Sequence, residues 1–170
     1  MSERFKVTIA KKNFIAFFAC FILIEAMLIA MLFTTEYRLL PAVLLIMITL
    51  IGIVAIFATG LFCVKVIGST IKVRTRMGRK FEFQCGEITQ VTCGKKDSTR
   101  YGPSFYITIK TKLNKVDIEG TMEGFTTMAG YLLDKHEVGE IKSTAVTYSC
   151  QGKLLQYKNG DIFKKRKSGK

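Results

Sequence analysis

Two groups of residues in this chain have types and spacings that could do chemistry, and both are charged. Glu25 lies alone in an apolar run of twenty residues, Phe14–Phe33, where a charge costs at least about 2.5–3.5 kcal/mol and marks a functional candidate. Lys72, Arg74 and Arg76 occupy alternate positions. Their side chains would leave the same side of a strand, which predicts a basic face.

Basic residues elsewhere in the chain could extend this face. Each Lys or Arg held near an anionic membrane surface contributes about 1 kcal/mol of attraction. The candidate contacts with lipid headgroups or a partner are Lys72, Arg74, Arg76, Lys80, Lys164, Lys165, Arg166 and Lys167. The alternative is a face that is only solvated and that reinforces the orientation of the chain in the membrane.

Catalytic and metal chemistry has little support in the sequence. The one histidine, His136, lies between Asp134 and Glu137, but helical spacing would not bring these three side chains together. The sequence lacks the glycine-rich phosphate-binding motifs, the nucleophile elbow and the zinc-protease motif. We therefore expect no enzyme activity, no catalytic residue, no metal and no cofactor.

The elements that must position the charged groups begin with two apolar segments. Phe14–Phe33 and Leu39–Val64 both reach the roughly 20 residues with which a helix crosses a hydrocarbon core of about 30 Å. The first run is longer than the apolar region of a signal peptide, and no A-x-A cleavage site follows it. Residues 34–38 alone separate the runs, so we expect an antiparallel transmembrane hairpin.

Lysine and arginine are distributed unequally around the predicted hairpin. Four precede the first run, one lies in the connection, and six follow the second run up to Lys80. The positive-inside rule then places both termini in the cytoplasm, in a multi-pass protein of the plasma membrane. The five cysteines have no metal-binding spacing and suit a reducing compartment. We interpret Cys85, Cys93 and Cys150 as small hydrophobic residues on strands.

Small residues recur along the first apolar run, and Glu25 lies more than about 90° from them around a helix. The small residues are Ala16, Ala19, Ala26 and Ala30, and Leu23 lies on the same stripe. This stripe is predicted to pack against small residues of the second run. Glu25 then has two interpretations. It is a protonated acid or one bonded to Thr49, which lies at a matching depth in the second run; otherwise it faces another protein chain, either a second copy or a different partner.

Beyond the hairpin the apolar residues change to a period of two. The pattern predicts strands around 71–75, 81–85, 88–93, 105–111 and 116–118, then an amphipathic helix over Thr121–His136. Alternation over Ile141–Cys150 and the pair Asn159-Gly160 predict further strands and a hairpin. The predicted division is an N-terminal flank and hairpin over 1–66 (helices about 14–33 and 39–64), a cytoplasmic domain over 67–163, and a basic tail over 164–170.

The strand order, the E-I-x-x-V element Glu87–Val91 and the final amphipathic helix resemble the pleckstrin-homology-like (PH-like) fold. The resemblance covers roughly residues 68–136 and implies a curved antiparallel sheet or barrel closed by a helix. Bacterial membrane proteins that join one or two helices to such a domain are the type that this chain resembles. The implied fold class is α+β, a two-helix transmembrane hairpin followed by a PH-like domain with extra C-terminal strands.

Charge is segregated within the predicted domain. Residues 65–115 carry a net charge of +9, residues 116–152 carry −4, and the residues from 153 onward carry +6. Phe81, Phe83 and Phe105 fall on apolar faces, so we do not expect nucleic acid as a partner. We expect a non-catalytic binding or assembly module at the cytoplasmic face that contacts the lipid bilayer, anionic lipid headgroups, or a membrane-protein partner or second copy. The alternative is an accessory subunit of a transporter or secretion complex whose hairpin is the working interface.

Overall fold

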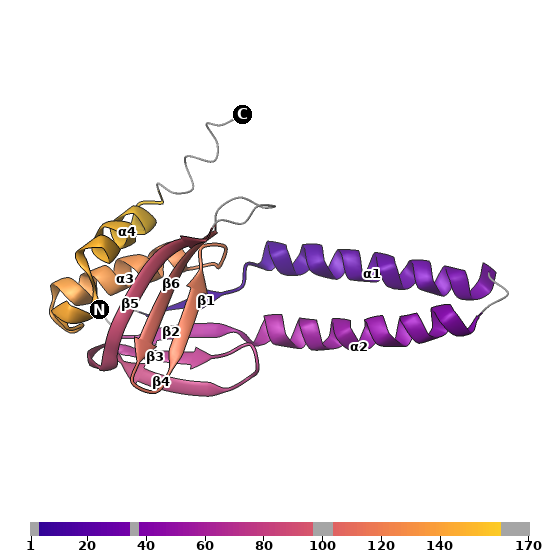
Figure 1. Ribbon diagram of the computed structural model, residues 1–170, viewed down its shortest axis with the longest axis horizontal. Coiled ribbons are helices and arrows are strands. Elements are labelled where there is room, and N and C mark those ends of the chain that lie inside the picture. The colour runs from indigo at the N-terminus through magenta and orange to yellow at the C-terminus, as the bar shows by residue number, and fades with distance from the viewer. Residues whose placement is uncertain (1–3, 35–37, 97–103, 161–170) are drawn as a thin grey trace, which may run out of the picture. The chain divides into compact units, whose positions relative to one another are not determined.

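The computed structural model describes residues 4–34, 38–96 and 104–160. The chain forms two compact units, whose elements are drawn in Figure 1. One unit contains residues 9–62 and 75–79, and the other contains the residues up to 8, 63–74 and those from 80 onward. The fold class is α+β, with two apolar helices and two antiparallel sheets.

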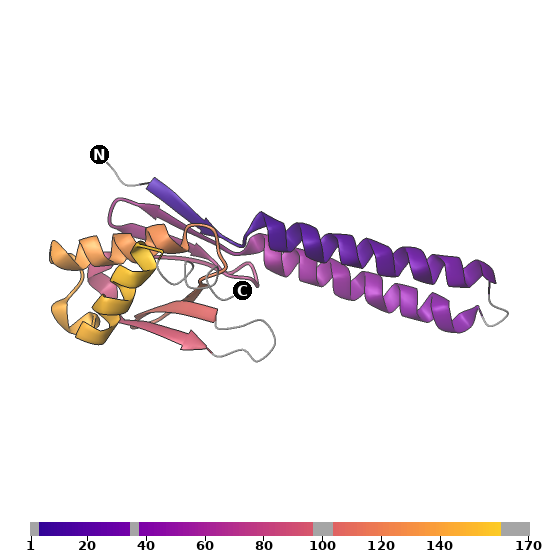
Figure 2. The same cartoon turned by 90° about the horizontal axis from the view of Figure 1, so that it is seen from above.

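Two long apolar helices, α1 (Lys11–Thr34) and α2 (Leu39–Leu61), form most of the first unit. Within them Ile15–Thr34 and Leu39–Phe57 are long and apolar enough to cross a membrane, and few of these side chains are buried within the protein. Figure 2 shows the two helices side by side along their length. Both predicted helices are confirmed, although α2 ends before Val64 because the backbone of Phe62 is extended.

A four-stranded antiparallel sheet begins before the hairpin and resumes directly after it. Across the sheet its strands are β1 (Arg4–Thr8), β2 (Cys63–Ile67), β3 (Thr70–Arg74) and β4 (Lys80–Gln84). Thr8 of β1 lies opposite Cys63 of β2, so the helices are an insertion between two neighbouring strands. The prediction that residues 1–66 form only a flank and a hairpin was therefore wrong.

A second, three-stranded antiparallel sheet follows a short 3-10 turn at Cys85–Glu87. Its strands are β5 (Ile88–Lys96), β6 (Ser104–Thr111) and β7 (Lys115–Glu119). They confirm the strands predicted at 88–93, 105–111 and 116–118. The alternation places one set of side chains in the core, where Ile107, Ile109 and Ile118 are almost completely buried.

Helix α3 (Phe125–Glu137) covers the core with its buried face, which includes Met128 and Leu132. The Tyr131 hydroxyl donates a hydrogen bond to the Gly68 carbonyl oxygen at 2.8 Å, which ties the helix to the turn between β2 and β3. Because a buried hydroxyl needs a partner, this contact sets the rotation of α3 over the four-stranded sheet.

The predicted helix over Thr121–His136 is confirmed, but it begins four residues late. The backbone of Glu123 exchanges two hydrogen bonds with the backbone of Thr8, extending the four-stranded sheet beyond β1. Gly124 then turns the chain with φ 85°, a conformation that favours glycine. The pairing with β1 therefore delays the start of the helix, and β1 was not part of the sequence-based prediction.

The segment predicted to form extra C-terminal strands is helical, and that prediction was wrong. Residues Ser143–Ala145 form a 3-10 turn, and α4 occupies Tyr148–Lys158. The Thr147 side chain caps α4 by accepting a hydrogen bond from the Cys150 backbone N–H. Gly160 has φ 68° and donates its N–H to the Tyr157 carbonyl oxygen. The Asn-Gly pair thus ends a helix, as glycine commonly does, instead of joining two strands.

Helix α4 is joined to β5 by a disulfide and by hydrogen bonds. Cys93 and Cys150 are paired, with their Cα atoms 5.3 Å apart. Cys93 lies on a strand as predicted, whereas the prediction of a strand at Cys150 was wrong, and neither cysteine is only a packed hydrophobic residue. The Tyr157 hydroxyl donates to the Gly94 carbonyl oxygen at 2.9 Å. Burial, with a further effect of Tyr106, raises the pKa of Tyr157 to about 12. The hydroxyl therefore keeps its proton, and this hydrogen bond, throughout the neutral range.

Replacing residues 9–62 by Asn-Gly should give a folded, water-soluble domain. Thr8 and Cys63 lie directly opposite one another, and Asn-Gly favours the two-residue turn that joins such strands. Circular dichroism and a cooperative urea transition would detect the fold. A fragment that begins at Gly68 lacks β1 and β2 and serves as the control, with no cooperative transition expected. Equal cooperativity in the two proteins would contradict a structural role for the β1–β2 pair.

Candidate functional site

The outer face of the four-stranded sheet is strongly basic. Alternation sends Val7, Val64 and Val73 into the core and the intervening side chains outward. Six outward residues are basic and exposed: Arg4, Lys6, Lys65, Lys72, Arg74 and Lys80. We call this set the basic face. Two exposed acidic residues share this side of the sheet: Glu82 of β4, and Glu123, whose backbone pairs with Thr8 at the edge of β1.

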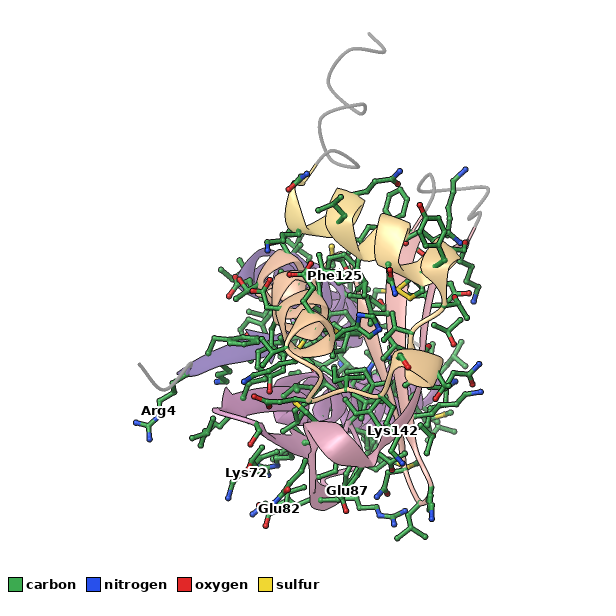
Figure 3. All side chains as sticks on the ribbon, turned by 90° about the vertical axis from the view of Figure 1, so that its left-hand side faces the viewer. Arg4, Lys72, Glu82, Glu87, Phe125 and Lys142 are labelled. Atoms are coloured by element: carbon green, nitrogen blue, oxygen red, sulfur yellow. A yellow bond between two sulfur atoms is a disulfide. The ribbon has the colours of Figure 1, made fainter. Side chains whose placement is uncertain are left out.

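Three lysines of the basic face lie in one row across three strands. Lys6 is opposite Lys65, Lys65 is opposite Lys72, and Lys72 is opposite Glu82. Lys72 Nζ lies 2.9 Å from a Glu82 carboxylate oxygen, and Figure 3 shows these two side chains together on the outside of the sheet. Like charges directly opposite each other on neighbouring strands destabilise a sheet. The row therefore costs folding stability that an anionic ligand would recover.

A second pair of like charges lies at the end of the sheet where the hairpin is inserted. Arg74 is opposite Lys80 on one side and Cys63 on the other, and Cys63 is opposite Thr8. Positive charge thus continues to the row of residues from which the chain enters and leaves the hairpin. In the row at the other end of the sheet, Arg4 is the basic residue.

The structure places the basic residues predicted from sequence in three different settings. Lys72, Arg74 and Lys80 belong to the basic face, whereas Arg76 lies in the turn between β3 and β4. The predicted tail contacts lie outside the described residues; they are Lys164, Lys165, Arg166 and Lys167. Sequence reasoning missed Arg4, Lys6 and Lys65. Lys6 and Lys65 could have been found from the alternation in Phe-Lys-Val at 5–7 and in Val-Lys-Val at 64–66. Both tripeptides lie next to the apolar runs.

Glu25 and Thr49 meet between the two long helices. Thr49 Oγ1 lies 2.7 Å from Glu25 Oε1 and 2.8 Å from the Leu45 carbonyl oxygen. A hydroxyl has one proton to donate. The Thr49 hydroxyl therefore lies between two acceptors, one on each helix, and can donate to either of them. Of the two interpretations of Glu25, the structure therefore shows the contact within the chain.

The surface through which α1 meets α2 differs from the predicted one. Phe21, Glu25 and Leu28 face α2, with Leu28 buried and the Phe21 ring lying over Gly52. A Cβ atom at Gly52 would overlap that ring. The alanine stripe predicted to pack against α2 is exposed, and its Leu23 is 69% exposed. Large side chains set the helix contact instead, because Gly52 provides the space into which an aromatic ring fits.

The polar residues at the end of α3 make separate contacts. Asp134 forms an ion pair with Lys158 of α4 at 2.9 Å and raises the pKa of that lysine. His136 Nε2 lies 3.5 Å from Gln151 Nε2, and Glu137 is exposed. Within the described part of the chain, no three His, Cys, Asp or Glu side chains gather in a way that could hold a metal ion.

A double-mutant cycle should detect coupling between Glu25 and Thr49. Glu25→Leu and Thr49→Val should be non-additive by about 0.6 kcal/mol, the average for hydrogen bonds between membrane helices, in reversible unfolding of the full chain in bicelles. Thr34 bonds to the Ala30 carbonyl of its own helix, so Thr34→Val is the matched control and should be additive with Glu25→Leu. Additivity in both cycles would contradict the pair. Glu25→Leu should also leave the size of the protein on native gels unchanged.

Comparison with known proteins identifies a family that the chain matches. The model of the family of unknown function DUF6560 matches residues 3–126, a segment that contains β1, both long helices and both sheets. No curated protein and no solved structure shows a significant match. The matched segment ends where α3 begins, so α4 lies beyond the match. Because the match covers well over half of its length, the chain belongs to the DUF6560 family.

Proposed function

We propose that this protein is a membrane-anchored, non-catalytic binding module that holds the basic face against anionic lipid headgroups at the cytoplasmic side of the plasma membrane. The row Lys6–Lys65–Lys72 carries the proposal, because three adjacent like charges are costly in water and favourable beside an anionic surface. The bilayer anchor is the pair α1 and α2, both long and apolar enough to cross it.

Chain length keeps the lysine row near the anchor in any orientation of the domain. Lys65 follows the last residue of α2 by four residues and Lys6 precedes the first residue of α1 by five, so their Cα atoms lie at most about 14 Å and about 18 Å from the helix ends. A headgroup layer is roughly 5–7 Å thick, and the surface potential extends about 8–10 Å beyond it. The row is therefore within reach of an anionic leaflet.

The fold also supports a PH-like identity for the extramembrane unit. Seven antiparallel strands in two sheets precede α3, whose buried face covers the core. Five of these strands, β3 to β7, and α3 are the elements on which the sequence resemblance rests. The insertion of a hairpin between β1 and β2 departs from a domain simply fused after its anchor. The alternative function is an accessory subunit of a transporter or secretion complex whose hairpin is the working interface. The contact of Glu25 with Thr49 within the chain favours it less than a Glu25 that faces outward would.

Neutralising the row should weaken binding to anionic membranes. In the hairpin-replaced domain, Lys6→Gln, Lys65→Gln and Lys72→Gln together should lose up to about 3 kcal/mol of affinity for phosphatidylglycerol vesicles, at about 1 kcal/mol per lysine. Vesicle flotation across a salt series would measure the loss, and phosphatidylcholine vesicles should bind little of either protein. Because like charges are removed, the triple variant should be at least as resistant to urea as its parent.

A matched triple variant tests whether position matters or only net charge. Lys110, Lys112 and Lys142 are exposed and lie outside the four-stranded sheet, so their replacement by Gln removes the same charge and should cost less vesicle binding. Heparin serves as a second anionic surface. Equal losses from both triple variants, on vesicles and heparin alike, would mean that binding is unspecific attraction and that the basic face is not a site.

The distribution of basic residues favours a cytoplasmic domain, whereas the disulfide favours the opposite orientation. Ten basic residues flank the two helices on the side of the domain and one lies between them, which favours the cytoplasm. The pairing of Cys93 with Cys150 is more typical of an oxidising compartment. We give priority to the charge asymmetry, since it involves ten basic residues against one, whereas the disulfide is a single pair.

Labelling of intact cells should decide the orientation. In a variant without native cysteines, Thr35→Cys should react with an impermeant maleimide added outside, because residue 35 lies between the two helices in sequence. Leu113→Cys, at an 89% exposed position of the domain, should react only after permeabilisation. The reverse labelling would place the domain outside.

A further inference from the structure

The turn between β3 and β4 is a closed three-residue loop with an apolar tip. Gly78 donates its N–H to the Thr75 carbonyl oxygen at 2.9 Å, and the Thr75 N–H is donated to the Arg79 carbonyl oxygen at 2.9 Å. Gly78 has φ 81°, as such hairpin loops require of their last residue. Met77, next to it, is 97% exposed. We call residues Thr75–Arg79 the Met77 turn.

The Met77 turn belongs to the same compact unit as the two long helices, whereas the strands that it joins belong to the other unit. A Cβ atom at Gly78 would lie 3.7 Å from Leu61 Cδ1, at the last residue of α2. The helix ends at Leu61, and the uncharged run to which it belongs extends to Val64. The turn therefore lies beside the end of the apolar run, which reaches the bilayer surface when the helix crosses a bilayer.

The residue types of the Met77 turn suit that depth. Methionine has a flexible apolar side chain that packs into irregular apolar surroundings. It is flanked by Arg76 and Arg79, both exposed, and guanidinium groups bind phosphate through paired hydrogen bonds. The turn between β6 and β7 offers an internal comparison: Leu113 is 89% exposed beside Lys112, but that turn belongs to the other unit.

We propose that the Met77 turn is a second bilayer contact beside the hairpin, with Met77 inserted among the upper acyl chains and Arg76 and Arg79 bound to phospholipid phosphates. This inference rests on the proposed function in one respect, that the hairpin spans a bilayer. The contact would hold the β3–β4 end of the four-stranded sheet at the membrane surface. In this proposal Arg76 contacts the bilayer as part of the Met77 turn and not as part of the basic face.

Single tryptophans give a direct test, because the chain contains none. Met77→Trp and Leu113→Trp would each be made in the full chain and placed in nanodiscs of phosphatidylglycerol and phosphatidylcholine. Tryptophan at 77 should emit at shorter wavelength than tryptophan at 113. Lipids brominated high on the acyl chain should quench its emission strongly, and acrylamide should quench it weakly. Tryptophan at 113 should show the opposite pattern.

A third position separates failure of this inference from failure of the anchor. Phe57→Trp, at a 65% exposed site in α2, should be quenched by brominated lipid whenever the hairpin spans the bilayer. Quenching at 57 without quenching at 77 would overturn the Met77 contact alone, and no quenching at either would overturn the anchor. Arg76→Gln with Arg79→Gln in the Met77→Trp protein should reduce quenching by brominated phosphatidylglycerol. Unchanged quenching would overturn the arginine–phosphate part.

Discussion

The pairing of β1 with β2 is the constraint on which the rest of this structure depends. Thr8 and Cys63 lie opposite each other, although the whole helical hairpin separates them in the chain. The two helices can be accommodated only if they leave the sheet and return to it at the same place. An antiparallel pair of nearly equal length satisfies this condition, and α1 and α2 form such a pair. A single helix inserted there would place β1 and β2 on opposite sides of a membrane.

The same pairing determines where the positive charge gathers. Arg4 and Lys6 precede the hairpin and Lys65 follows it, and without β1 they would belong to a flexible flank and a short link. Pairing places them on one face with Lys72, Arg74 and Lys80. Residues that flank the hairpin in the sequence thus also form a surface. Like charges on neighbouring strands repel one another within that surface.

One edge of each sheet, at β1 and at β5, pairs with a segment that follows the strands in sequence. The backbone of Glu123 pairs with Thr8 at the free edge of β1, and Val146 bridges to Val91 of β5. Pairing of this kind protects edge strands from other chains. Tyr131 of α3 and Tyr157 of α4 then donate hydrogen bonds to backbone carbonyls of the two sheets. The C-terminal helices therefore close a domain whose first strand lies before the hairpin.

The sequence by itself determined the features that depend on local pattern. Continuous apolar runs specify α1 and α2, alternation specifies β3 to β7, and a 3.6-residue period specifies α3. Local spacing also places Lys72 and Arg74 on one side of a strand. It places Glu25 and Thr49 at matching depths in the two apolar runs.

Tertiary structure alone decided the features that depend on distant partners. β1 and β2 are short, and each is a strand because the other pairs with it across the hairpin. Alternation over 141–150 looked like a strand because Ile141, Val146 and Cys150 are all buried, yet Thr147 caps a helix there and Cys150 meets Cys93. The side of α1 that meets α2 was decided by the space above Gly52, which the Phe21 ring fills. At each of these sites, burial and pairing between segments distant in the sequence override the local pattern. The reason is that the conformation of one segment depends on the segment that it contacts, which its own residues do not specify.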